Sequence, residues 1–195
     1  MHDRLLQNCR ALLAAYASSA LGNCRMPEDS NPDFTDEDRE KRLAYFTLPM
    51  SLNYQRNSYK LWEATLKAYN DPDTTDVFSI EASATMSIEE LRRKLLKHKV
   101  ALQPNKHIQT WRRIAETIHE NWESLGNLLE YCDNDFLKLK TVLQNTHKKG
   151  FPYLSGPKIF NYWNFVMSTP AYGNVKLLNR EYVDIAPDTH ITKCS

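Results

Sequence analysis

Residues 148–158 have the sequence KKGFPYLSGPK, and our interpretation of the chain starts from this stretch. Its first half predicts a tight basic turn, because glycine and proline interrupt regular secondary structure. Gly156 and Pro157 break the chain, and Lys158 follows in the first turn of a helix predicted over residues 159–167. The stretch therefore predicts a basic turn that opens a helix.

A second stretch, APDTH at residues 186–190, places Asp188 after a proline and before a short helix start. Aspartate is a favoured helix cap because its carboxylate accepts hydrogen bonds from unpaired backbone N–H groups. A lysine amine and a carboxylate, each at a helix start, can form a nucleophile and its electrostatic partner. Capping alone is the commoner role of an isolated aspartate, and the pairing with Lys158 is what favours a catalytic role.

Together the two stretches resemble the signature of the helix-hairpin-helix DNA glycosylases, the superfamily of endonuclease III. In that family a loop close to Leu-Pro-Gly-Val-Gly-x-Lys is followed downstream by Val-Asp-Thr-His. Residues 156–158 match the end of the first motif, and residues 187–190 match the second. One of the two hairpin glycines is replaced, and 30 residues separate Lys158 from Asp188. This degenerate hairpin with a long insert is most similar to the archaeal GO glycosylases, which remove 8-oxoguanine.

The resemblance spans roughly residues 43–193 and includes an upstream motif. Residues 52–55, Leu-Asn-Tyr-Gln, followed by Trp62 are similar to an early helix of the family that carries Ser/Asn-x-Gln. It implies that Gln55 reaches into the base pocket, where its amide offers both a donor and an acceptor to a flipped base. The alternative is a solvated helix glutamine. Three aromatic residues could form a stacking wall, although aromatics at helical spacing are more often core: Trp111, Phe160 and Trp163.

The resemblance also implies the chemistry. Lys158 would attack C1′ of the damaged nucleoside, expel the base and hold the sugar as a Schiff base, after which elimination nicks the strand. An amine must be uncharged to attack, and a helix start and burial both favour the uncharged form. Asp188 would stabilise positive charge that develops on the sugar. The alternative role for Lys158 is a surface lysine that contacts phosphate.

Two basic clusters are candidates for binding DNA. The first consists of Lys148 and Lys149 and directly precedes the hairpin. The backbone N–H groups of the hairpin, from Leu154 to Lys158, would bind the DNA strand beside this cluster. The second, residues 92–99, is either a phosphate-binding patch or only the solvated face of a helix. We expect the first cluster and the hairpin to bind DNA through the following residues: Lys148, Lys149, Leu154, Ser155 and Gly156.

Composition sets limits on these interpretations. The chain has 195 residues, of which 42% are hydrophobic and 25% charged, as in an ordinary soluble globular protein. Its net charge of +1 provides no global basic field, so a nucleic-acid surface must be a local patch. We expect one domain, which acts as a monomer on double-stranded DNA.

Metals, cofactors and membranes are not expected from the sequence. The four cysteines are widely spaced without a CxxC pair, which argues against a disulfide framework, a zinc site or the iron–sulfur cluster of some endonuclease III relatives. The six histidines show no metal-binding spacing. No apolar run is long enough to span a membrane, and residues 11–21 make a poor signal peptide. We therefore expect a cytoplasmic, nucleoid-associated protein that is not secreted.

The apolar spacing predicts an all-α fold of seven or more helices with a degenerate helix-hairpin-helix motif. Residues 1–50 and the end after Asp188 are expected to form one lobe, and residues 51–168 the other. Only residues 189–195 follow Asp188, so we expect the helix that follows it in the family to be truncated here. Helices are expected at residues 2–21, 35–48, 51–69, 87–99, 104–122, 134–147 and 159–167, with a short extended piece at 77–80. The first is expected to be amphipathic, with Leu5, Leu12 and Leu13 on its apolar stripe, and Ser87 is expected to cap the fourth. Apolar residues from Ile108 to Trp122 in the fifth helix, and Phe136, Leu139, Val142 and Leu143 in the sixth, are expected to face inward.

The resulting hypothesis is a base-excision repair DNA glycosylase with abasic-site lyase activity. Its partner would be duplex DNA that contains a damaged base, 8-oxoguanine being favoured, or an abasic site. The alternative is a catalytically inactive or truncated DNA-binding protein of the same fold. A third class, a helical protein-interaction module, requires both motifs to be coincidences.

Overall fold

The computed structural model describes residues 2–22 and 25–184, and the regular secondary structure in this part of the chain is helical. The only β-type pairing among these residues is an isolated bridge between Asp135 and Leu178. The all-α fold class is thus confirmed. The α-helices of the described residues are α1 (His2–Ala17), α2 (Arg39–Thr47), α3 (Ser58–Asn70), α4 (Ile80–Thr85), α5 (Ile88–Lys97), α6 (Lys106–Trp122), α7 (Leu125–Tyr131), α8 (Phe136–Thr141) and α9 (Pro157–Ser168).

Shorter helical turns connect these helices, and one of them, η5, is a π-helical continuation of α8. The others are 3-10 turns, two of which begin at a proline. The turns are η1 (Pro27–Asp29), η2 (Asp36–Asp38), η3 (Pro49–Leu52), η4 (Thr75–Phe78), η5 (Val142–Thr146), η6 (Lys148–Gly150) and η7 (Arg180–Tyr182).

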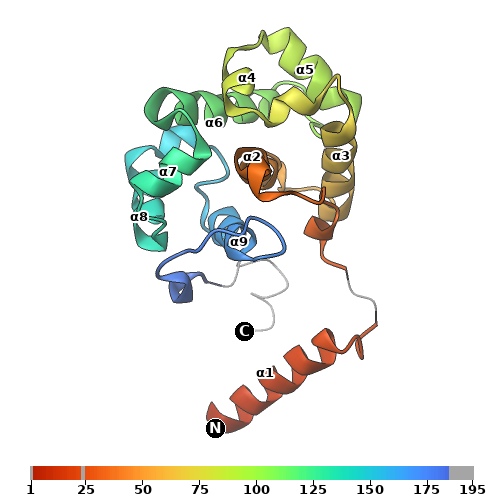
Figure 1. Cartoon of the computed structure of the whole chain (residues 1–195), viewed down its shortest axis with the longest axis vertical. Helices are drawn as coiled ribbons and strands as arrows, with labels where there is room; N and C mark the ends of the chain where they lie inside the picture. The colour runs from red at the N-terminus through yellow and green to blue at the C-terminus, as the bar shows by residue number, and fades with distance from the viewer. Residues whose placement is uncertain (1, 23–24, 185–195) are drawn as a thin grey trace.

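Helix α2 lies at the centre of the body, with α3 to α9 arranged around it (Figure 1). Every residue from 43 to 52 is buried, which is the pattern of a helix enclosed on all sides. One hydrophobic cluster extends from Leu43 to Tyr172 and crosses the boundary that we expect between residues 50 and 51. The division into two lobes stays a prediction.

The periodicity of α6 and α8 correctly predicts which faces are buried. The expected apolar face of α6, from Ile108 to Trp122, is buried throughout. The Trp111 indole N–H donates to Ser83 Oγ at 3.0 Å and so joins α6 to α4. In α8 and η5 the four residues expected to face inward are buried: Phe136, Leu139, Val142 and Leu143.

Two local predictions are wrong. The helix expected from residue 51 begins at Ser58, because the Asn57 side chain caps it by accepting the Lys60 N–H at 3.0 Å. Residues 77–80, expected to be extended, belong to η4 and the start of α4. Here the Ser79 hydroxyl accepts the Ala82 N–H at 3.2 Å, so a cap that we overlooked starts a helix.

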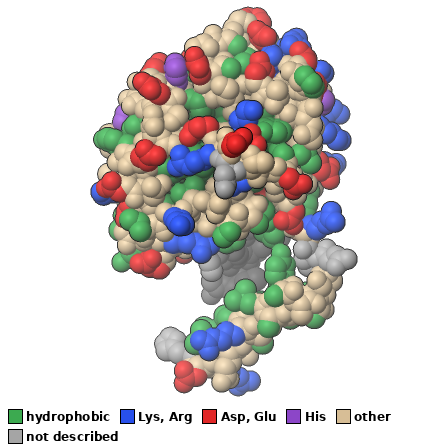
Figure 2. All heavy atoms as spheres, viewed as in Figure 1, with side chains coloured by type: hydrophobic (Ala, Val, Ile, Leu, Met, Phe, Trp, Pro, Cys, Tyr) green, Lys and Arg blue, Asp and Glu red, His purple; other side chains and the backbone are tan. Residues whose placement is uncertain are grey.

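Helix α1 projects from the body and exposes its apolar side chains (Figures 1 and 2). Leu13 is 67% exposed and Leu5 61% exposed, although both belong to the stripe that predicted an amphipathic helix. None of the described helices is both long and apolar enough to cross a bilayer. The body begins after α1, where tyrosine hydroxyls from the core hold the segment around η1. Among them, the Tyr162 hydroxyl donates to the buried Glu28 at 2.5 Å.

Candidate nucleic-acid interface

The loop between η5 and α9 is pressed against α6 and anchored in the core. Phe151 and Leu154 are fully buried, so every second or third residue of the loop points inward. A Cβ at Gly150 would lie 2.5 Å from the Thr117 side chain on α6, which is closer than real side chains approach. Gly150 therefore permits the contact between the hairpin and α6.

A groove lined by basic residues runs along the contact between α6 and this loop. It consists of two adjoining depressions of ≈ 630 Å³ and ≈ 530 Å³ that share Arg113 and Lys149. Glu116 is the only carboxylate among the residues that line them. We call this surface the α6 groove and define it by its five cationic residues: Lys106, Arg112, Arg113, Lys148 and Lys149.

The cations of the α6 groove differ in what they bind. The Arg112 guanidinium donates to the carbonyls of Ala84 and Met86 and thereby holds the end of α4. The side chains of Arg113, Lys148 and Lys149 make no hydrogen bond or ion pair within the described part of the chain. Three cations with one nearby carboxylate attract a polyanion, because no internal partner neutralises them.

Two tyrosines that are distant in sequence stack at one end of this groove. The rings of Tyr54 and Tyr153 are 3.9 Å apart and nearly parallel, with an interplanar angle of 12°. The Lys106 ammonium lies 5.3 Å and 5.1 Å from the two ring centroids. A point that is almost equally distant from the centroids of two stacked rings cannot lie above either ring and must lie beside the stack. The Lys106 ammonium therefore contacts the edges of the two rings. As a hydrogen-bond donor there, Lys106 lowers the pKa of Tyr153, whereas burial raises the pKa of Tyr54.

The stack brings the loop of Gln55 against the hairpin. Gln55 is exposed, and it lies in a loop rather than on the helix that we expected. Its φ of 50° places it in the left-handed region, which non-glycine residues rarely adopt. The reason lies in its neighbours, because Tyr54 is held by the stack and Arg56 donates to the carbonyls of Val100 and Lys99 at 2.6 Å and 3.2 Å.

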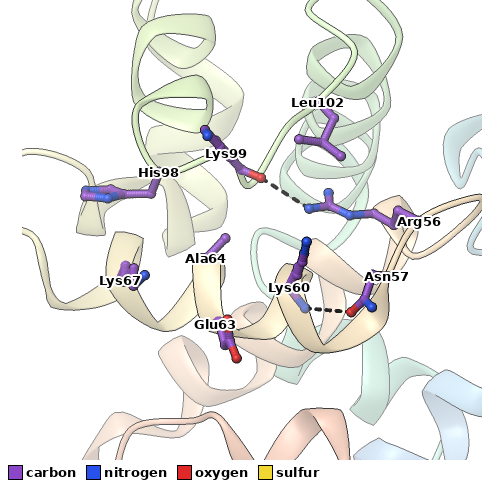
Figure 3. Close-up of a pocket in the computed structure, with 9 residues that line it drawn as sticks. All are labelled: Arg56, Asn57, Lys60, Glu63, Ala64, Lys67, His98, Lys99 and Leu102. Carbon is purple, nitrogen blue, oxygen red and sulfur yellow. Dashed lines mark hydrogen bonds between the residues drawn. The ribbon is translucent and has the colours of Figure 1, made fainter.

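Figure 3 shows this second anchor, with Arg56 reaching from the start of α3 to the Lys99 carbonyl across a small cleft. The cleft has a volume of ≈ 230 Å³ and lies between α3 and the residues that follow α5. Burial lowers the pKa of Arg56. Gln55 is thus presented to solvent from a loop whose two flanking side chains are both fixed.

Lys158 is exposed in the first turn of α9. Its ammonium group has no partner among the described residues, and neither do the backbone N–H groups of Lys158 and Ile159. These N–H groups belong to the unpaired start of a helix, where negative charge is favoured. The start of α9 therefore combines an exposed ammonium with two unpaired N–H groups, of which that of Ile159 belongs to a buried residue.

The hairpin N–H groups that precede Lys158 are less available than we predict from the sequence. Those of Leu154, Ser155 and Gly156 donate to carbonyls within the loop, at 2.7, 2.9 and 3.0 Å. The Leu154 side chain is buried in the core. These three N–H groups close a tight turn, and the expectation that this run binds a DNA strand stays a prediction.

Asp188 lies outside the described residues, so the predicted pair of Lys158 and Asp188 stays a prediction. Among the residues that the structure describes, no group of three or more His, Cys, Asp or Glu side chains is placed to hold a metal ion.

No family model matches the chain, and it matches neither a curated protein nor a solved structure.

The second basic cluster, at the end of α5, is paired internally. Arg93 binds Asp73 through two hydrogen bonds of 2.7 and 2.9 Å, and Lys97 bridges Asp71 and Asp73. Lys94 pairs with Asp76 at 2.7 Å. Hydrogen bonds from Lys97 and Arg93 hold the pKa of Asp71 and of Asp73, respectively, well below the ordinary range. We expected residues 92–99 to be either a phosphate-binding patch or the solvated face of a helix. The structure favours a helix face, because aspartates in the connection after α3 neutralise its paired charges.

The aromatics that we considered as a stacking wall belong to the core. Trp111, Phe160 and Trp163 are each at most 1% exposed. The tyrosine that lines the groove is instead Tyr153, with Tyr54 stacked on its ring, and sequence reasoning missed both.

Three groove cations were also missed, Lys106, Arg112 and Arg113, although a signal exists for two of them. Lys106 and Arg113 are seven residues apart and so lie on one face of α6. That face differs from the apolar face made by Ile108 and Trp111. The two tyrosines offer no comparable signal, because nothing local in the sequence indicates that residues 54 and 153 meet.

Proposed function

We propose that the chain is a helix-hairpin-helix DNA glycosylase with abasic-site lyase activity, acting on duplex DNA that carries an oxidised base, with 8-oxoguanine favoured. One observation carries the proposal. The stack of Tyr54 on Tyr153 holds the loop of Gln55 against the loop that leads to Lys158, beside the α6 groove. Base excision needs three parts close together: a surface that binds the DNA strand, a residue that recognises the damaged base, and a nucleophile.

In this proposal the α6 groove and the start of α9 bind the phosphates. Arg113, Lys148 and Lys149 supply unpaired positive charge, and the free N–H groups at the start of α9 supply directed donors. Phosphate contacts fix the position of the strand but carry no sequence information. Selectivity for the damaged base then depends on Gln55, whose amide can both donate to and accept from a base edge.

Lys158 would carry the chemistry. Its neutral amine forms a bond from nitrogen to C1′ while the bond from C1′ to the base breaks, and the base leaves with a proton. The C1′–O4′ bond then breaks as nitrogen forms the C=N bond of the Schiff base, and O4′ takes up the proton that the nitrogen loses. Loss of a C2′ proton expels the 3′ phosphate, which nicks the strand. Asp188 would stabilise the positive charge that develops on the sugar.

A DNA-binding protein of the same fold without catalysis is the second candidate. Its support is the exposure of Lys158 in the described structure, because lysine nucleophiles are usually activated by an apolar pocket or by a neighbouring cation. In that case Lys158 contacts phosphate together with Lys148 and Lys149. Covalent trapping separates the two candidates.

Replacing Lys148 and Lys149 by alanine should weaken binding to all DNA sequences alike. Because each lysine that neutralises a phosphate releases counterions, the log–log dependence of affinity on salt should flatten by about 1 to 2. The measurement is fluorescence anisotropy of a labelled duplex titrated at several potassium chloride concentrations.

A matched control removes two exposed lysines outside the α6 groove, Lys41 and Lys140. This variant has the same net charge as the first, so a general loss of charge affects both equally. An equal flattening in the two variants would mean that the groove does not bind the strand.

Replacing Gln55 by alanine should reduce excision of 8-oxoguanine while leaving nicking at a preformed abasic site intact. A site that hydrogen-bonds a base loses about 1 to 3 kcal/mol for each buried group left unpaired, and an abasic site presents no base to read. The measurement is a pair of nicking assays on duplexes that differ only at the lesion.

The neighbouring variant Arg56→Lys serves as the control, because it disturbs an anchor of the loop without touching the reading amide. If Gln55→Ala loses the same fraction of nicking activity on both duplexes, Gln55 supports the structure of the loop or contacts the DNA backbone. If the parent chain nicks abasic DNA but leaves 8-oxoguanine in place, the substrate is another lesion.

A further inference from the structure

Tyr153 has an unusual position for an aromatic side chain. It is half-buried, lines the α6 groove and has a φ of 62°, in the left-handed region. Backbone strain of this kind persists only where the surroundings hold the residue in place. The buried residues Phe151 and Leu154 on either side supply that support.

The ring of Tyr153 is fixed from behind. One face is covered by Tyr54 at 3.9 Å, and Tyr54 is itself packed edge-on by His107 at 5.4 Å. Burial lowers the pKa of His107 to about 4, and its Nδ1 accepts the Leu102 N–H at 3.1 Å. The His107 side chain behind the stack is therefore neutral at pH 7 and held in place.

Among the described residues, Lys106 is the only cation placed against the Tyr153 ring. Lys106 lies at the edge of the stack, beside the hydroxyl group, rather than above a ring. Lys149 and Arg113 line the same depression. An aromatic ring supported on one side, at the end of a cationic groove, combines the two elements of single-strand binding sites: a stacking surface and a track for phosphates.

We propose that Tyr153 is a stacking platform for an unpaired nucleobase of a DNA strand whose phosphates lie in the α6 groove. The inference rests on the proposed function, because it assumes that the groove binds DNA. It adds a second base contact, separate from the one proposed for Gln55. The base held on Tyr153 is undamaged, since stacking makes use of the π-face that every base has.

An unpaired base fits this geometry better than a base pair does. In a duplex both faces of each base are covered by its neighbours, so stacking on a protein ring requires an unpaired nucleotide. The shortage of carboxylates in the groove favours a polyanionic strand over an acid-bearing or neutral partner. The platform would hold a base next to the point where the duplex is opened.

The test uses the full chain and two single strands of equal length and charge. One is an oligothymidylate, and in the other the bases are replaced by tetrahydrofuran abasic units. Both present the same phosphates, so a difference in affinity reports contacts to the bases. The parent chain should bind the oligothymidylate roughly 5- to 100-fold more tightly, the range expected for one stacked base.

Variants at position 153 test whether Tyr153 causes the preference for the oligothymidylate. Tyr153→Phe keeps the ring and should keep the preference, whereas Tyr153→Leu keeps an apolar side chain but should bind the two strands equally. The salt dependence of binding should be the same in both variants, because neither changes the charge.

The outcomes separate this inference from the proposed function. Salt-dependent binding with equal affinity for the two strands would overturn the stacking platform and leave the groove intact. No salt-dependent binding of either strand would overturn the groove and the platform together. If Tyr153→Leu retains the full preference while its thermal unfolding matches that of Tyr153→Phe, the base stacks on another residue.

Discussion

Replacing Lys158 by alanine should abolish covalent trapping of DNA. When the parent chain is incubated with duplex containing 8-oxoguanine or an abasic site, borohydride should reduce the Schiff base to a stable protein–DNA adduct. Without the amine no Schiff base forms, so the adduct should fall to the level of a protein-free sample. The adduct is measured as a band of reduced mobility in a denaturing gel.

Lys158→Arg is the matched variant for this experiment. A guanidinium group keeps the positive charge and the phosphate contact but stays protonated, so it cannot act as a nucleophile. Lys158→Arg should therefore bind DNA like the parent chain and yet give no adduct. If Lys158→Ala traps as much DNA as the parent chain, the nucleophile is another residue. If the parent chain binds DNA but forms no adduct, the non-catalytic candidate is correct.

Replacing Trp163 by alanine should lower the free energy of unfolding by about 3 to 5 kcal/mol. Trp163 is 1% exposed, and its indole N–H donates to Thr47 Oγ1 at 3.0 Å. The substitution leaves a cavity beside α2 and removes the donor from a buried hydroxyl. A loss of this size is a large part of the total stability of a typical domain, which is about 5 to 15 kcal/mol.

Phe165, on the same helix, is the matched control. It is 41% exposed, and Phe165→Ala should change stability by only about 0.5 kcal/mol. Urea unfolding followed by tryptophan fluorescence and circular dichroism measures both variants, with the slope against urea unchanged if each unfolds in two states. A small loss in Trp163→Ala together with weakened DNA binding would contradict our assignment of this tryptophan to the core.

Local sequence patterns were sufficient where one helix decides its own structure. The apolar residues of α6 recur at steps of three and four, and this spacing alone identifies the face that becomes buried. The Ser87 hydroxyl accepts the Glu90 N–H at 3.2 Å, as expected from a capping residue directly before a helix. The Gly156–Pro157 break likewise predicts where α9 begins.

The same reasoning failed where a short-range signal was ambiguous. Residues 51–57 have apolar and aromatic members that suit a helix, yet the chain there forms a loop that ends at the Asn57 cap. The stripe of α1 predicts an amphipathic helix, but periodicity cannot indicate which surface covers it. In the described structure its leucines are exposed.

The sequence by itself determined the helical fold class, most helix positions and the residue types of the candidate site, because these depend on neighbours within a few positions. The tertiary structure alone decided which charges are free. Three cations of α5, Arg93, Lys94 and Lys97, are neutralised by acids about twenty residues away. By contrast, Arg113, Lys148 and Lys149 line a groove nearly without carboxylates. It also decided that Tyr54 meets Tyr153, because such contacts form only when distant segments pack around the same core.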